Sequence, residues 1–278
     1  MNAQRLAGTA RLLAVDIGNT AVKSALFTAI PPAIGTLPTP DFTSESPAFA
    51  GNEAALPESW PLDGVPWFVS SVNRPLWERL LDWHARRGLR PAPRLLSLAD
   101  LPLRVDVEFP EKVGLDRLAT AVAADWLRTP ARPAVVVDAG TALKVHALSA
   151  EGVFLGGAIL PGLRLASESL HANTDRLPRV PVSTNDVPPA AIGRHTEAAI
   201  RSGIYWGAVG AVRELLARMR VELAADPQVF ITGGDAAGLA PLIDHDTRFV
   251  PHLCLAGIAL IALRRLALRT AADDGAGE

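Results

Sequence analysis

The chain has 278 residues, enough for one large domain or two moderate ones, and its 49% hydrophobic and 20% charged residues are typical of a globular protein. The net charge of −2 indicates no nucleic-acid-binding surface, and the apolar segment from Leu253 to Leu263 is too short to span a bilayer. The single cysteine, Cys254, excludes an intramolecular disulfide and a cysteine-based zinc site. With no signal segment recognised, we expect a cytoplasmic protein that binds neither nucleic acid nor membrane.

The first predicted element is a hairpin, with apolar strands over residues 12–15 and 21–27 joined by an acidic turn. Asp16 ends the first strand, and Gly18, Asn19 and Thr20 form a turn that tolerates positive φ. A carboxylate in such a turn can hold Mg²⁺ or its waters, while free amides and a hydroxyl can contact phosphate oxygens. Taken alone, the segment is equally compatible with an ordinary hairpin.

Further strands and helices are predicted between this hairpin and residue 130, starting with a third strand among the loops of residues 28–63. The others are a strand over 67–71, a helix over 76–87, a strand-and-loop passage over 91–107 and a helix over 118–128. Asp116 precedes the last helix as an N-cap or first-turn acid. Prolines at 130 and 133 then interrupt the chain, so we predict two halves, residues 1–130 and 131–278.

The second half opens with a copy of the acidic hairpin. Residues 134–148 read A-V-V-V-D-A-G-T-A-L-K-V-H-A-L, in which Asp138, Gly140 and Thr141 repeat the acidic turn with one residue fewer. Two such turns suggest a duplicated domain that holds a nucleotide between its halves. The pattern resembles the actin, sugar kinase and Hsp70 superfamily. The resemblance implies an α/β protein with two ribonuclease-H-like halves of the actin-like ATPase fold and a central ATP cleft.

The remaining elements are predicted from local pattern and turn residues. They are strands over 152–161 and 229–234 and helices over 163–173, 196–220, 236–243 and 255–270. The helix over 196–220 carries Gly203, Gly207 and Gly210, and small residues at this spacing predict close helix packing.

A set of motifs in a fixed order then identifies a family resemblance. These are D-I-G-N-T from Asp16, V-S-S-V from Val69, V-G-L-D-R from Val113, D-A-G-T-A from Asp138, G-G-A-I-L-P-G from Gly156, L-P-R-V from Leu177, I-R-S-G-I from Ile200, I-T-G-G-D from Ile231 and P-H-L-C-L-A-G from Pro251. Together they resemble the type III pantothenate kinases, which phosphorylate pantothenate in the first step of coenzyme A synthesis. The resemblance covers nearly the whole chain from Leu12 to Leu263.

The resemblance implies roles for individual residues. Asp116 matches the general base and Arg117 the anchor of the pantothenate carboxylate. Asp16 matches a ligand of Mg²⁺, and Asp138 a ligand of a monovalent cation, K⁺ or NH₄⁺. The residues implied to contact ATP are Gly18, Asn19, Thr20, Lys23, Gly140, Thr141, Gly233 and Gly234. Those implied to contact pantothenate are Val107, Gly114, Leu115, Thr174 and Thr196, with Thr174 commonly supplied by the partner subunit of a homodimer.

Departures from the family pattern leave alternatives open. Leu143, Lys144 and His146 replace residues of the second turn, and Val107 stands where the family often has tyrosine. Lys144 either supplies a charge in place of the cation or is a solvated strand residue, and we favour the latter. The alternatives for function are a nucleotide-binding accessory regulator without kinase activity and a kinase with a different acceptor.

Overall fold

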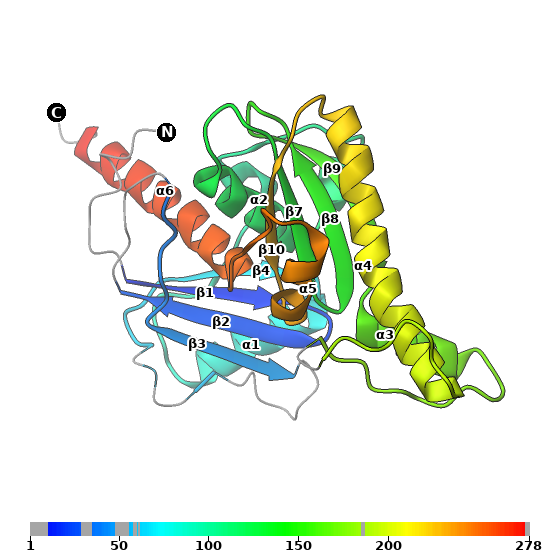
Figure 1. Cartoon of the computed structure of the whole chain (residues 1–278). Coiled ribbons are helices and arrows are strands. Elements are labelled where there is room, and N and C mark those ends of the chain that lie inside the picture. The colour runs from blue at the N-terminus through cyan, green and yellow to red at the C-terminus, as the bar shows by residue number, and fades with distance from the viewer. Residues whose placement is uncertain are drawn as a thin grey trace. The chain divides into compact units, whose positions relative to one another are not determined.

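The structure is a computed structural model that describes residues 11–28, 35–47, 56–57, 60, 62–184 and 187–275, with side chains as far as residue 267 (Figure 1). It divides into two compact units. Unit 1 contains the chain up to Leu127 together with the segment from Leu253, and unit 2 runs from Arg128 to His252. No helix in the described part of the chain is long and apolar enough to cross a membrane.

Unit 1 is built on a sheet with the strand order β3-β2-β1-β4-β5. The first three strands are antiparallel neighbours, and β4 and β5 extend the sheet in parallel with β1. The bounds are β1 Leu12–Ile17, β2 Ala21–Phe27, β3 Phe42–Pro47, β4 Trp67–Ser71 and β5 Arg94–Leu95. A further short strand, β6, covers Arg104–Val105.

Unit 2 repeats this topology. Its strands follow the order β9-β8-β7-β10-β11, in which β7, β8 and β9 are antiparallel neighbours and β10 and β11 run parallel to β7. The bounds are β7 Ala134–Ala139, β8 Ala142–Leu148, β9 Val153–Pro161, β10 Gln228–Thr232 and β11 Arg248–Phe249. Each unit therefore has the ribonuclease-H-like order 3-2-1-4-5, which confirms the predicted duplication.

Helices pack on the sheet of unit 1. Helix α1 (Arg74–Arg86) buries Leu76 and Leu80 in a core cluster that also contains Leu13 and Val15 of β1. Helices α2 (Leu115–Leu127) and α6 (Leu253–Gly275) pack on each other, and α6 also contacts β1, β2 and β4. Two 3₁₀ turns, Leu98–Asp100 and Pro110–Lys112, complete the unit.

The position of α6 corrects the predicted domain boundary. We predicted a second half of residues 131–278, but the segment from Leu253 belongs to unit 1 because α6 packs there. Its attachment is also polar: Arg264 donates to the Leu101 carbonyl at 3.0 Å, and Arg265 forms an ion pair with the buried Asp100. The local pattern of α6 predicted a helix but not the surface on which it packs.

The predicted start of α2 is also corrected. The helix begins at Leu115, ahead of the expected Leu118, so Asp116 lies inside the first turn and is not the N-cap. A first-turn carboxylate still interacts favourably with the helix dipole.

Helices α4 (Thr196–Glu222) and α5 (Ala236–Ile243) form the core of unit 2 with β7, β8 and β10, whereas α3 (Leu163–Ala172) packs beside α4. Tyr205 and Val212 of α4 are buried in this core. The glycine face of α4, defined by Gly203, Gly207 and Gly210, is exposed, and no described atom lies within 4 Å of a Cβ built at any of the three. The predicted packing of these glycines is therefore wrong for contacts within the described chain.

Two glycine-to-alanine changes should have opposite effects on the free energy of unfolding. A Cβ at Gly257 of α6 would overlap the Ala119 carbonyl of α2, so Gly257→Ala should destabilise by about 1–3 kcal/mol through overpacking. Within one chain Gly203→Ala meets open space in an exposed helix, so it should stabilise the isolated monomer by about 0.5–1 kcal/mol. Urea unfolding of both variants measures the difference. Equal effects would contradict the packing of α2 on α6.

Candidate active site

The first acidic turn lies at the end of β1 in unit 1. Asp16 is half-buried and is paired across the hairpin with Lys23 of β2, and on its other side with Ser70 of β4. The Gly18 amide donates to the Ala21 carbonyl at 3.0 Å and closes the turn. Direct register partners on neighbouring strands point to the same face, so Asp16 and the buried Ser70 lie on one face of the sheet.

Asp116, the candidate general base, lies close to the end of β4. The Val72 amide donates to the Ile17 carbonyl at 3.1 Å, directly after β4. A Cβ built on Gly114 would lie 3.4 Å from Val72 Cγ1 and would overlap Oδ1 of Asp116. The G-L-D-R segment therefore lies at the end of β4, beside β1. Gly114 leaves the space that the Asp116 carboxylate occupies.

Arg117 follows Asp116 in the first turn of α2 and is half-buried, as are Leu115 and Val107. Burial lowers the pKa of the Arg117 guanidinium, and the nearby charge of Asp116 opposes that shift. Arginine stays protonated in proteins, so Arg117 places a positive charge in a partly dry environment. Such a group favours an anionic ligand, and a planar carboxylate suits its geometry.

The second acidic turn lies at the end of β7 in unit 2 and repeats the first in register. Asp138 pairs with Lys144 across the hairpin and with Thr232 of β10 on the other side. The Gly140 amide donates to the Ala142 carbonyl at 3.3 Å, and Thr141 at the turn is exposed. The acid, the lysine and the hydroxyl residue on the other neighbouring strand therefore occupy equivalent positions in the two units. Ser70 is the hydroxyl residue in unit 1 and Thr232 in unit 2.

Lys144 differs from the interpretation that we favoured for it. Its Nζ lies 2.8 Å from Oδ2 of Asp138, and the two side chains are only 20% and 21% exposed. Lys144 is therefore an ion-paired residue of the turn and not a solvated strand residue. The strand register brings the two charges together, since they are direct cross-strand neighbours.

Two glycines allow other segments to reach the second turn. The Gly162 amide donates to the Thr141 carbonyl at 3.0 Å, and a Cβ on Gly162 would overlap the Gly140 carbonyl oxygen. Gly233, with φ of +106°, lies so close to β7 that a Cβ would overlap the Ala139 carbonyl. Gly233 must therefore lack a side chain, because β7 occupies the space that a side chain would fill. Gly234 is exposed with open space around it, and can meet a ligand.

Sequence analysis missed several residues around the turns, although all of them except Thr184 lie in a quoted motif. They are Ser70, Gly162, Thr184, Thr232 and Asp235. The Asp235 amide donates to the Ala139 carbonyl at 3.0 Å, and the Thr184 hydroxyl lies 3.3 Å from Oδ1 of Asp235. Burial raises the pKa of Asp235, and the Thr184 hydrogen bond opposes the shift. Only the positions of these residues on neighbouring strands and loops show that they surround the acidic turns.

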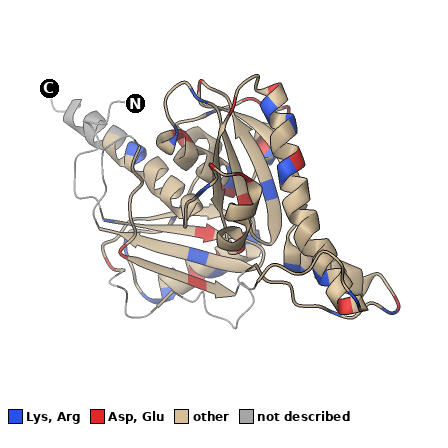
Figure 2. Ribbon diagram, viewed as in Figure 1, with Lys and Arg blue, Asp and Glu red and all other residues tan. Residues whose placement is uncertain are grey.

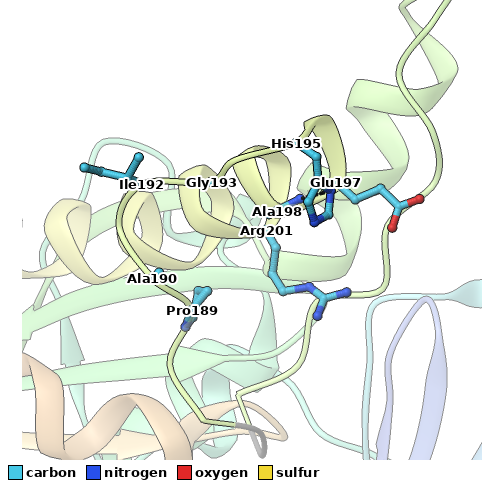
Figure 3. Close-up of a pocket in the computed structure, with 8 residues that line it drawn as sticks. All are labelled: Pro189, Ala190, Ile192, Gly193, His195, Glu197, Ala198 and Arg201. Atoms are coloured by element: carbon cyan, nitrogen blue, oxygen red, sulfur yellow. Dashed lines mark hydrogen bonds between the residues drawn. The ribbon is translucent and has the colours of Figure 1, made fainter.

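The two threonines predicted to contact substrate lie elsewhere in unit 2. Thr174 follows α3, and its exposed hydroxyl donates to the Leu170 carbonyl at 2.7 Å. Thr196 is the first residue of α4, directly after His195, whose ring nitrogen accepts from the Ala198 amide at 3.4 Å. A pocket of about 350 Å³ surrounds this helix start, with Arg201 and Glu197 extending from α4 (Figure 3). Its lining residues are Pro189, Ala190, Ile192, Gly193, His195, Glu197, Ala198 and Arg201.

The carboxylates that could hold a metal ion are those of the acidic turns. Acidic and basic residues are spread over both units (Figure 2), and no three histidines, cysteines or carboxylates group to hold a metal among the described residues. Mg²⁺ commonly binds through one or two carboxylates together with nucleotide phosphates. Asp16, with the amides of its turn, is suited to that kind of site.

The repeated strand order, with an acidic turn after the first strand of each unit, is the fold of the actin-like ATPases and sugar kinases. A solved structure from Campylobacter jejuni, assigned to the Baf family of transcriptional activators, matches with a TM-score of 0.55 and 22% identity over 91% of this chain and 98% of that one. One from Sinorhizobium meliloti, assigned as a 2-dehydro-3-deoxygalactonokinase, has a TM-score of 0.53 and 14% identity over 90% and 98%. At these identities, the likeness concerns the fold.

The family is more specific than the class. The family model for type III pantothenate kinase matches residues 12–218. The type III pantothenate kinase of Acidiphilium cryptum is 38% identical over 191 residues, 66% of this chain and 68% of the relative. That of Rhodopirellula baltica is 42% identical over 192 residues, 66% and 67% of the two chains. The chain therefore belongs to the type III pantothenate kinase family.

The raised pKa of Asp235 predicts the sign of a pH effect on stability. Above this pKa, folding must keep an ionised carboxylate in a partly dry place, so Asp235→Asn should unfold at a higher temperature than the parent at pH 7. As pH falls through the folded-state pKa, the parent takes up a proton and the difference should shrink. Thermal melts at several pH values measure it. A less stable Asn variant at neutral pH would contradict the prediction.

Proposed function

We propose that the protein transfers the γ-phosphoryl group of ATP to the hydroxyl of pantothenate, forming 4'-phosphopantothenate in the first step of coenzyme A synthesis. Family membership supports the substrates. The observation that supports the chemistry is the position of Asp116 and Arg117 beside the end of β1, where the first acidic turn begins. Because the reaction consumes ATP, we place the protein in the cytoplasm.

Each of the two acidic turns is proposed to contact phosphates of ATP. Their glycines and hydroxyl residues present amides and side chains suited to phosphate oxygens. In this proposal the contacts come from Gly18, Asn19, Thr20 and Lys23 in unit 1 and from Gly140 and Thr141 in unit 2, with Gly233 and Gly234 at the adenosine end. Asp16 would hold Mg²⁺, which neutralises charge on the phosphates when bound. The family resemblance implies Asp138 as a ligand of K⁺ or NH₄⁺, but its ion pair with Lys144 already supplies a positive charge at that carboxylate.

Pantothenate is proposed to bind against the start of α2. Arg117 binds the pantothenate carboxylate. Asp116 then removes the proton from the pantothenate hydroxyl as the hydroxyl oxygen attacks the γ-phosphorus of ATP. A carboxylate is a sufficient base because a loose transition state requires proton removal only late. The remaining contacts are assigned to Val107, Gly114, Leu115, Thr174 and Thr196.

The general-base role of Asp116 predicts a large loss of activity with little loss of stability. Asp116→Asn keeps a side chain of the same size and should lower kcat by about 10²–10⁴-fold, the usual contribution of a positioned base. Removing a first-turn charge should cost only about 0.3–1 kcal/mol of stability. Gly114→Ala should also lower kcat, because a Cβ would displace the carboxylate.

The assay couples ADP release to phosphopantothenate formation, with melting temperature measured in parallel. The parent should form both products in equal amounts. An Asn variant that melts normally and turns over within a few-fold of the parent would leave Asp116 a helix-stabilising residue. A parent that binds ATP but phosphorylates nothing would favour the accessory-regulator alternative, and ADP formation with another acceptor would favour a changed substrate.

We further propose a homodimer in which the glycine face of α4 contacts the partner. These glycines are exposed, and Leu165, Leu170 and Ile192 are also exposed in unit 2. Small residues on one helix face allow close approach of another backbone.

The dimer proposal predicts that a bulky side chain on the glycine face weakens association. Gly207→Leu should raise the dimer dissociation constant by tenfold or more, since about 1.4 kcal/mol of lost contact suffices for that change. Sedimentation equilibrium measures it, with Ala85→Leu on the exposed side of α1 as control. A monomeric parent, or an unchanged Gly207→Leu dimer, would contradict the proposal.

A further inference from the structure

The strand register explains why Lys144 approaches Asp138. In unit 1 the equivalent lysine, Lys23, has Glu45 of β3 as its neighbour on the outer side, and its Nζ lies 3.8 Å from that carboxylate. In unit 2 the outer neighbour of Lys144 is Ile159 of β9, which has no charge. The acidic cross-strand neighbour of Lys144 is Asp138, and its ammonium lies 2.8 Å from Oδ2.

This ion pair does not fit a monovalent cation at Asp138. A cation there would sit beside an ammonium of the same charge, and the attraction of the carboxylate for it is already offset. An unpaired carboxylate beside the second turn would repel nucleotide phosphates, so a charge that neutralises it serves phosphate binding. The pairing within the hairpin supplies such a charge permanently.

We infer that Lys144 is a built-in replacement for the monovalent cation, and that this protein works without K⁺ or NH₄⁺. The inference rests on the proposed function for its activity measurements. Lys144 is a positioning residue in this account, because it acts through Asp138 on the turn of Gly140 and Thr141. It adds no step to the transfer itself.

The first experiment measures phosphopantothenate formation in K⁺, NH₄⁺, Na⁺ and tetramethylammonium chloride at equal ionic strength. The parent should have the same rate in all four salts. Lys144→Met keeps most of the side-chain length without the charge, so its rate in tetramethylammonium should fall. K⁺ or NH₄⁺ should restore the rate by roughly 5- to 150-fold, the usual coupling between two ligands.

Two matched variants separate the charge from the fold. Lys144→Arg keeps a positive charge and should show no response to K⁺. The double variant Asp138→Asn/Lys144→Met lacks both charges and should lose the response seen in Lys144→Met. A parent whose rate rises severalfold with K⁺ would overturn the inference, as would a Lys144→Met variant that responds to no cation.

A second measurement does not depend on turnover. Melting temperatures of the parent and Lys144→Met in KCl and in tetramethylammonium chloride, each with ATP and Mg²⁺, report the cation site directly. K⁺ should raise the melting temperature of Lys144→Met and leave the parent unchanged. If no salt supports phosphorylation, the proposed function fails while this comparison still decides the role of Lys144. An equal K⁺ effect on both proteins would overturn the inference.

Discussion

The register of the first strand of each unit with its two neighbouring strands is the constraint on which the candidate site depends. It places an acid opposite a lysine and beside a hydroxyl, as Asp16, Lys23 and Ser70 in unit 1 and as Asp138, Lys144 and Thr232 in unit 2. A slip by one residue would move every side chain of the strand to the opposite face. The slip is costly because it would turn the Asp16 carboxylate to the face on which Ile17, only 1% exposed, is buried.

Backbone packing around the turns adds a second constraint. At Gly162 and Gly233, other segments come so close to the turn after β7 that no side chain fits. In unit 1, Gly114 gives the same freedom to the carboxylate of Asp116. Groups held in this way need little rearrangement when a ligand binds, which preserves binding energy for the reaction.

The fold could be predicted largely from local patterns. Apolar runs followed by an acidic turn gave β1, β2, β7 and β8, and the motif at Gly114 to Arg117 indicated the candidate base before any geometry was known. Such features work because strand alternation, turn chemistry and motif spacing are properties of neighbouring residues.

The rest depends on residues distant in sequence. The pairing of Lys144 with Asp138 follows from an apolar neighbour on β9, and the exposure of Gly207 from the side of α4 that faces the sheet. Neither the ion pair nor the exposure of Gly207 can be predicted from a short segment of the sequence. The same holds for Asp235, whose partner Thr184 comes from another loop.

The assignment of α6 to unit 1 has a consequence for the order in which the protein folds. Unit 2 is one continuous stretch of chain inserted into unit 1. During synthesis from the N-terminus, β1 to β5 emerge first but lack the helix that packs on β1 and β4. Domains generally fold as units as they emerge, so unit 2 has all its segments available before unit 1 does. The earliest strands of the chain therefore wait longest for their complete core, with apolar surface exposed in the meantime.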